Sequence, residues 1–309
     1  MKFTNNTLRN IASQSLTLIL VAIMLIFSVP ALAQDEEEAP KADKPARDAF
    51  ESAWWFDGQT GKVYQKGNLE MIMNHRFGTI KSGNNDLFGI YGAANIRLGF
   101  NYSPIDKLNV GFGYTKFKSI LDLTAKYAIL TQTRSNSMPV SLTYYGNMGI
   151  ELTADENNEI YLNSTDRYNY FNQLIVMRRF SSKFSAQIAP SYTHYNAVKW
   201  EEQDDGSWAR MENDTWGISF GARYKVSPTM IIMVGYDQPL TQHAIKQPLP
   251  SINIGLVIAT SSHAFQIFFT NYSKIQPQEN YMFNQNDFTK TGDGSVWLIG
   301  FNITRLWSF

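Results

Sequence analysis

The sequence predicts an all-β fold: a transmembrane antiparallel up-and-down β-barrel of about twelve strands, preceded by a short periplasmic N-terminal segment. Three observations predict this fold class. The chain begins with an export signal, its strands alternate apolar and polar residues, and it ends on an aromatic strand. A long apolar strand edge invites aggregation in water, whereas a closed barrel pairs that edge and turns its apolar face to lipid.

The first 33 residues are typical of a secretory signal peptide. Lys2 and Arg9 precede an apolar run over residues 16–29, and the small residues Ala31 and Ala33 mark a cleavage site at their end. Beyond the signal, no apolar run reaches the ~20 residues of a spanning helix, so any further membrane passage must use strands. We therefore expect export to the cell outer membrane.

Composition excludes several classes of protein. The chain has no cysteine, which rules out disulfides, thiolate chemistry and a lipid anchor on an N-terminal cysteine. Without the signal, 25 basic residues face 27 acidic ones, a formal charge of −2 that offers no footprint for nucleic acid. Aromatic residues reach 14% and fall in alternating strings, which favours a barrel over a soluble sandwich.

Two segments separate the signal from the first predicted strand. Residues 34–48 are rich in Glu, Lys, Ala and Pro, so we expect a flexible periplasmic tether. Residues 49–66 are too aromatic for a linker, and two interpretations remain open: a segment packed against the periplasmic mouth, or a plug inside the lumen. The aromatic residues are Phe50, Trp54, Trp55 and Phe56. The predicted domains are the signal (1–33), the tether with the aromatic segment (34–66) and the barrel (67–309).

Alternation and turn residues predict the strands of the barrel. Most have about the 9 to 11 residues that a tilted strand needs to cross a bilayer. The predicted strands are 68–77, 93–102, 108–117, 120–131, 140–152, 170–180, 183–196, 215–226, 230–240, 251–260, 263–272 and 296–306. Short and long connections alternate between them, as a bacterial barrel requires. The exception is a tight bend at residues 116–119, which we keep because an even strand count leaves both ends of the barrel on one side.

Polar and charged side chains recur on one face of several predicted strands. Arg or Lys at the bilayer midplane costs about 2 to 4 kcal/mol, so we expect this face to line the lumen. The candidate residues are Glu70, Asn74, Arg76, Asn95, Arg97, Arg223, Asp237 and Gln266. Arg178 and Arg179 are adjacent, so one of them must point outward, and the sequence does not say which.

Short motifs lie along the predicted strands. They include Asn74-His75-Arg76-Phe77-Gly78, Ala189-Pro190-Ser191 with His194 and Asn196, and Gly300-Phe301-Asn302-Ile303. Over residues 50–309 the sequence resembles an uncharacterised family of Gram-negative outer-membrane β-barrels, known only as a domain of unknown function with an N-H-R-F-G motif in its first strand. It departs from that pattern at Tyr114-Thr115 and at Ser261-Ser262. The resemblance implies the fold and the location, and it implies no activity.

The four histidines are the residues to test for chemistry, because outer-membrane enzymes use Ser–His or Asp–His constellations. His75 and His194 have lipid-facing parity, His243 lies in an outer loop, and His263 opens a strand at the periplasmic rim. No pair has metal-ligand spacing, and we expect no carboxylate held beside them. We therefore predict no catalytic residue, no metal and no cofactor.

We expect a non-enzymatic membrane protein. The preferred hypothesis is a narrow channel or solute-binding conduit, because the inward face mixes both signs of charge with amides. The alternative is a closed structural or docking barrel that binds a partner through its outer loops or its N-terminal segment, and an outer-membrane enzyme comes third. The expected partners are outer-membrane lipid, the barrel-assembly machinery and a possible small solute, but no nucleic acid.

The last strand carries an expected assembly signal on its outward face, made of Phe301, Trp307 and Phe309. Deleting Phe309 should lower the yield of folded protein in membranes, because the terminal aromatic residue of this face is lost. Heat-modifiable migration in gel electrophoresis measures the folded fraction. An unchanged amount of heat-modifiable protein in the outer membrane would contradict this prediction.

Overall fold

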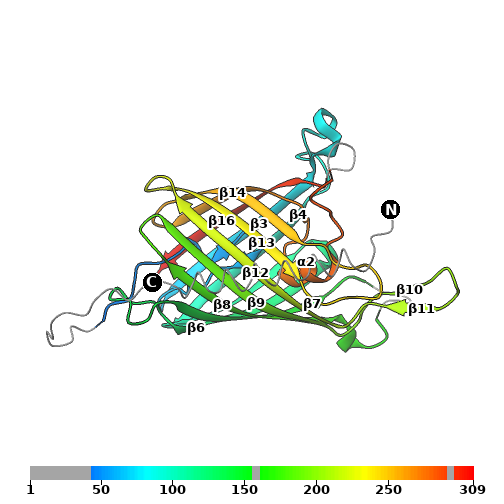
Figure 1. Ribbon diagram of the computed structural model, residues 1–309, viewed down its shortest axis with the longest axis horizontal. Coiled ribbons are helices and arrows are strands. Elements are labelled where there is room, and N and C mark those ends of the chain that lie inside the picture. The colour runs from blue at the N-terminus through cyan, green and yellow to red at the C-terminus, as the bar shows by residue number, and fades with distance from the viewer. Residues whose placement is uncertain (1–42, 155–160, 291–295) are drawn as a thin grey trace, which may run out of the picture. The chain divides into compact units, whose positions relative to one another are not determined.

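The computed structural model describes residues 43–154, 161–290 and 296–309. The predicted signal peptide and most of the predicted tether lie outside these residues. The unit from Lys44 to Phe309 contains one closed barrel, drawn from the side in Figure 1. Each barrel strand pairs antiparallel with the next, and the last strand pairs with the first to close the wall. The predicted twelve-stranded antiparallel barrel is confirmed.

The barrel strands follow one another around the wall in chain order. They are β3 (Asn68–Thr79), β4 (Asn95–Ile105), β5 (Leu108–Thr115), β6 (Ile120–Leu130), β7 (Ser141–Glu151), β8 (Tyr168–Arg179), β9 (Phe184–Tyr195), β12 (Asp214–Lys225), β13 (Met230–Pro239), β14 (Ser251–Ala259), β15 (His263–Thr270) and β16 (Leu298–Ser308). The predicted bend between β5 and β6 is the 3-10 turn η2 (Phe117–Ser119), where Lys118 and Ser119 have positive φ.

The remaining elements lie between the barrel strands or before them. Two short hairpins are separate from the wall: β1 (Trp54–Trp55) with β2 (Gly58–Gln59), and β10 (Trp200–Glu202) with β11 (Trp208–Arg210). The helical elements are η1 (Ile80–Asp86), η3 (Ser164–Arg167) and α2 (Pro277–Phe283). Within the described part of the chain, no helix has the length and apolar content needed to cross a membrane.

The two ends of the barrel differ in their connections. At the end where β3 begins and β16 ends, which we call the turn end, short turns such as 106–107 and 260–262 join the strands. At the opposite end, the loop end, the connections include residues 80–94 and 271–297. Figure 1 shows the C-terminus at the turn end and α2 at the loop end. Short turns on one side and long loops on the other are typical of bacterial barrels.

The last strand shows how side chains divide between the two faces of the wall. Leu298, Gly300, Asn302 and Thr304 are buried, whereas the alternate residues Ile299 to Ile303 are partly exposed. Around the whole wall, the exposed face carries large apolar side chains, among them Phe112, Ile254, Leu256 and Ile267. Such a surface is unfavourable in water and suits lipid, so the buried face is the interior of the barrel.

Candidate functional site

Most of the described chain before the first barrel strand, from residue 49 on, lies inside the barrel. We call residues 44–67 the N-terminal insert. Pro45 forms a β-bridge with Thr133 in the turn between β6 and β7. The Gly67 amide donates to the Ser103 carbonyl oxygen at 2.9 Å, next to the turn between β4 and β5. Both ends of the insert are therefore at the turn end, and the hairpin of β1 and β2 projects from there into the interior.

Aromatic side chains hold the insert in place. Phe50, Trp55 and Phe56 are at most 2% exposed, and the rings of Phe56 and Phe268 are 4.7 Å apart between centroids. Fully burying a large apolar side chain is worth about 1.5 to 3 kcal/mol. Their partners on the wall are Met177, Ile231, Met233, Val257, Ala264 and Phe268. The sequence carried a signal for this contact, because residues 230–234 are apolar on both faces of β13.

Two glycines in the wall leave room for the indole ring of Trp55. Gly221 of β12 and Gly235 of β13 are paired directly across the two strands. A Cβ atom on Gly221 would lie 2.6 Å from Trp55 Cζ2, and one on Gly235 would lie 2.5 Å from Trp55 Nε1. Real Cβ atoms do not approach other atoms this closely, so both positions require glycine for Trp55 to dock against the wall.

Side chains of the wall bind the backbone of the insert. Its hairpin forms no ladder with the barrel, so its carbonyl oxygens need other donors. Asn302 Nδ2 donates to the Phe56 carbonyl oxygen at 2.6 Å, and Lys126 Nζ donates to Ala53 at 3.0 Å. The further bonds of this kind run from Arg223 to Ala49, from Gln266 to Trp54, from Lys126 to Thr60, from Gln187 to Gln59 and from Thr143 to Gly61.

Glu70 is a polar anchor for the insert and is fully buried. Its carboxylate accepts hydrogen bonds from Tyr64 Oη at 2.7 Å and from Trp54 Nε1 at 3.1 Å, both from the insert. Asn101 of the wall donates a third bond at 3.1 Å. A buried carboxylate costs several kcal/mol unless it is paired or hydrogen-bonded, and these three donors meet that requirement.

A second segment fills the barrel from the loop end. We call residues 271–288 the outer insert; it contains α2, whose side chains from Pro277 to Met282 are buried. Gln278 Nε2 donates to Asn147 Oδ1 at 2.7 Å, and Glu279 forms an ion pair with Lys118 at 3.3 Å. The sequence predicted a long loop here but not its position inside the barrel.

The two inserts meet inside the barrel at Asp57. Tyr272 Oη donates to Asp57 Oδ1 at 2.6 Å, and Asn280 Nδ2 donates to the other carboxylate oxygen. Beside them, Tyr281 Oη donates to Asp237 on the wall at 3.3 Å. The cavity between these residues measures about 10 Å³, which is room for one water molecule at most. The two inserts are therefore in direct contact in the middle of the barrel.

A buried ion pair in the wall contacts both inserts. Arg97 Nη2 lies 2.6 Å from Asp122 Oδ2 and Arg97 Nε lies 2.9 Å from Oδ1, so the pair is bidentate. The Arg97 guanidinium also lies over the Trp54 ring of the N-terminal insert at 4.9 Å. Gln276 of the outer insert donates to Asp122 Oδ1 at 2.9 Å. One pair of charges thus links the wall to both inserts.

The eight candidate residues all project toward the interior, but they form no single site. Asn95 lies near the loop end, where its Nδ2 donates to the Ser273 carbonyl oxygen at 3.1 Å. Arg76 Nη1 donates to Asn302 Oδ1 at 3.1 Å. Six of the eight are at most 2% exposed, namely Glu70, Asn74, Arg76, Arg97, Arg223 and Gln266. Whether they line a water-filled lumen stays a prediction.

The structure also shows how the two adjacent arginines of β8 and the aromatic residues near the C-terminus are oriented. Arg179 lies on the inward parity of β8, and Arg178 lies on the other face, where its Nη2 approaches Asn136 Oδ1 at 3.5 Å. Phe301 and Trp307 are partly exposed, and Phe309 is 86% exposed while its amide donates to the Gly67 carbonyl oxygen at 3.2 Å. The role of these aromatic residues in assembly stays a prediction.

The expectation that no carboxylate lies beside a histidine is wrong for His194. Its Nδ1 lies 2.6 Å from Asp214 Oδ1, and Tyr192 Oη donates to the same oxygen at 2.5 Å. Asp214 begins β12 directly opposite His194 on β9, one residue before the predicted start of that strand. All three side chains lie on the outward face, away from the inserts.

The other histidines have structural partners. The ring of His75 stacks on Phe301 with 4.9 Å between centroids, and His263 Nε2 bonds to Arg305 at 2.7 Å. Burial lowers the pKa of His243 in its loop, and its Nδ1 accepts a hydrogen bond from the Glu212 amide at 3.0 Å. Among the described residues, no three acidic or histidine side chains are grouped as metal ligands.

The family model described as a membrane bound beta barrel domain (DUF5777) matches residues 50–307. A comparison with curated protein sequences found no match.

Solved structures of similar fold include outer-membrane channels. An outer-membrane channel from Pseudomonas putida F1 is 10% identical with a TM-score of 0.48, over 87% of this chain and 100% of that one. The NanC porin is 8% identical with a TM-score of 0.45, over 78% and 99% of the two chains. The KdgM porin is 9% identical with a TM-score of 0.41, also over 78% and 99%. Identities this low concern the fold alone.

Replacing Arg97 by Met should lower the free energy of unfolding by about 3 to 5 kcal/mol, because Asp122 is left as an unpaired buried charge. Urea-induced unfolding in lipid vesicles measures this loss. The double variant Arg97→Met with Asp122→Leu should be more stable than Arg97→Met alone, since it removes both charges. A single variant that unfolds at the same urea concentration as the unmodified protein would contradict the prediction.

Proposed function

The chain belongs to the DUF5777 family of membrane-bound β-barrel domains, and on this premise we propose that it is a gated outer-membrane conduit for small polar solutes. The observation that carries the proposal is the pairing of the insert hairpin. β1 and β2 pair only with each other, while the wall closes through its own ladders from β3 to β16. Withdrawal of the N-terminal insert therefore breaks no hydrogen bond between barrel strands.

The interior that withdrawal exposes is suited to water. Glu70, Arg97, Asp122 and Lys126 would remain on the inward face, together with amide side chains such as Gln266. Water can replace the hydrogen bonds that these groups make to the insert, so each lost bond costs about 0.5 to 1.5 kcal/mol net, or about 1.5 to 3 kcal/mol for a bond to a charged group. Mixed charge in a lumen of this kind favours small polar solutes without a strong preference for either sign.

The direction of gating follows from the two ends of the barrel. Short turns face the periplasm in bacterial barrels, which assigns the turn end to the periplasmic side. The N-terminal insert would then withdraw into the periplasm, and the outer insert would move away from the cell. Outer-membrane lipid and the barrel-assembly machinery are the partners that such a protein requires for its location.

A closed docking barrel is the second candidate, and the apolar contacts of the insert favour it. Withdrawal would expose Phe50, Trp55 and Phe56 together with their partners on the wall. At about 1.5 to 3 kcal/mol for each side chain, this cost opposes withdrawal, and water cannot offset it as it can for the polar contacts. If the inserts never move, the function lies on the surfaces that the barrel displays at its two ends.

An enzymatic role has less support. The His194–Asp214 pair has the geometry of a general base with its orienting carboxylate. Among the described residues, however, no Ser or Thr hydroxyl is bonded to His194, and the other side chain bonded to Asp214 is that of Tyr192. We therefore assign this group a structural role that ties β9 to β12.

Conductance across a planar lipid bilayer separates the conduit from the docking barrel. The mature chain should be silent, because both inserts are docked. A chain that lacks residues 34–66 and has residues 274–288 replaced by a short Gly-Ser linker should show steps. Heat-modifiable migration is the control for correct folding. Silence of this folded double deletion would overturn the conduit and leave the docking barrel.

A substitution at Gly221, against which the Trp55 ring packs, allows the N-terminal insert to be displaced without deletion. Gly221→Leu places a side chain where the Trp55 ring lies, so it should undock the insert and red-shift the tryptophan fluorescence. Ala222→Leu is the matched control, because this neighbour points to the outward face of the same strand. An unshifted fluorescence spectrum for Gly221→Leu, or an equal shift for both variants, would contradict docking of Trp55 against Gly221.

A further inference from the structure

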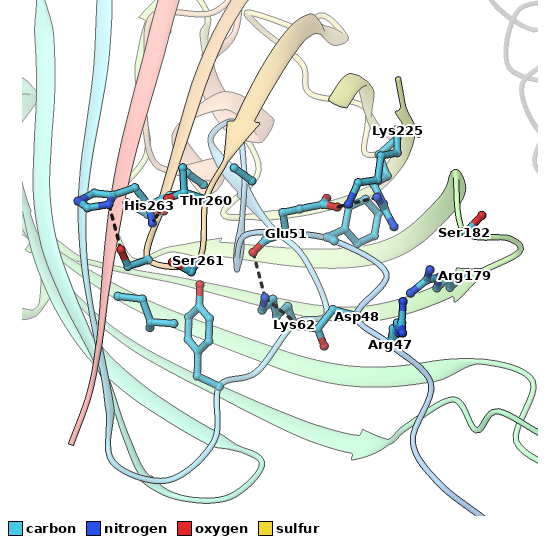
Figure 2. A pocket seen from close by; sticks show the side chains of 18 residues that line it. Arg47, Asp48, Glu51, Lys62, Arg179, Ser182, Lys225, Thr260, Ser261 and His263 are labelled. Atoms are coloured by element: carbon cyan, nitrogen blue, oxygen red, sulfur yellow. Dashed lines mark hydrogen bonds and ion pairs between the residues drawn. The ribbon is translucent and has the colours of Figure 1, made fainter. Parts of the chain in front are cut away.

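Two adjoining cavities open at the turn end. One, of about 330 Å³, lies between the N-terminal insert and the ends of β12, β14 and β16. The other, of about 370 Å³, lies between Ala46, the turn at residues 132–134 and the end of β8. Arg47 and Arg179 line both cavities. In Figure 2 these two residues lie on one side of the first cavity, across from His263.

The first cavity carries an excess of positive charge. Five Lys and Arg side chains line it, against the two carboxylates of Asp48 and Glu51. Both carboxylates are already paired: Glu51 with Arg223 at 2.7 Å and with Lys225 at 3.6 Å, and Asp48 with Lys62 at 2.8 Å. These pairs account for three of the five cations.

The other two cations are Arg47 and Arg179. Within residues 43–154, 161–290 and 296–309, neither of them forms an ion pair. Both line the same two cavities, and the second of these has no carboxylate in its lining. Like charges held together at a water-filled cavity favour binding of an anion.

The second cavity contains no acidic residue. Its lining combines Arg47, Arg134 and Arg179 with the polar residues Gln132, Thr133 and Ser181. Arg134 Nε donates to the Pro45 carbonyl oxygen at 3.2 Å, and Arg179 Nε donates to that of Ser181 at 3.0 Å. Each guanidinium is thus fixed through Nε, and its two Nη atoms remain available as a planar fork. Such forks bind phosphate and carboxylate groups in a bidentate manner.

We propose that these two cavities form a binding site for a soluble anion with several negative charges on phosphate or carboxylate groups, held by Arg47, Arg134 and Arg179. The cavities have the size of a small-molecule site. Arg179 lies on the inward parity of β8 and Arg47 belongs to the insert, so the site faces the mouth of the barrel. A soluble ligand therefore fits better than a phospholipid headgroup, which would bind on the outward face.

This site goes beyond the proposed conduit and does not require that the inserts move. The side chains and bonds that form it are present while the insert is docked. Failure of the conductance experiment would leave the anion site untouched, and absence of anion binding would leave the conduit untouched.

Isothermal titration of pyrophosphate into the mature chain, in an uncharged detergent at low salt, tests the site. One saturable binding event is expected. Arg134→Gln and Arg179→Gln should each weaken binding by about tenfold or more, the effect of losing a charge-assisted bidentate contact. Lys107→Gln is the matched control, because Lys107 is exposed at the same end, outside both cavities, and carries the same charge. Heat-modifiable migration confirms that each variant is folded.

Two further experiments test whether a different source of negative charge, from the chain itself or from lipid, occupies the site. The acidic run Asp35-Glu36-Glu37-Glu38 precedes Arg47 in the sequence, so the titration is repeated with its three Glu residues changed to Gln. In vesicles of zwitterionic lipid, adding an anionic phospholipid should leave pyrophosphate binding unchanged. Competition by that lipid would overturn the soluble ligand in favour of a headgroup. No binding in either chain, or an equal loss in Lys107→Gln, would overturn the site itself.

Discussion

The ion pair between Arg97 and Asp122 organises the interior of this barrel. It connects β4 with β6 across the intervening β5, and the guanidinium can cross because Gly113 has no side chain: a Cβ there would lie 2.2 Å from Arg97 Nη2. A buried pair of charges is stable only when further hydrogen bonds and packing replace water. Trp54 and Gln276 supply them from opposite ends of the barrel. The wall and its two inserts therefore stabilise one another.

Bore size explains why the interior contains whole segments of chain. Eight strands leave room for side chains only, and sixteen leave an open channel, so a barrel of twelve strands has a bore that its own side chains do not fill. Here the remaining space is taken by a hairpin from the turn end and a short helix from the loop end. Their contact at Asp57 completes the filling.

The wall was predictable from the sequence, whereas of its contents only the N-terminal insert was anticipated, as one of two interpretations, and the outer insert was not. A period of two determines which residues face inward, so Glu70 and Arg97 could be assigned from the sequence alone. Alternation says nothing about what fills a barrel. The local signs of a docked segment were the aromatic residues of 49–66, for which a plug was one of two open interpretations, and the apolar double face at residues 230–234. The His194–Asp214 contact required cross-strand register, which a single strand does not reveal. The orientation of Arg178 and Arg179 required it too.

The place of the N-terminal insert in the chain has a consequence for the order of folding. The insert is made before β3, yet three of its carbonyl oxygens are bound by side chains of β12, β15 and β16, at a sequence separation of up to 246 for Phe56 and Asn302. Contacts of such separation form late. The insert therefore cannot dock fully until β12 to β16 have formed. Once they form, the insert provides a surface against which these strands pack. Closure of the cylinder and burial of its first segment thus become a single event.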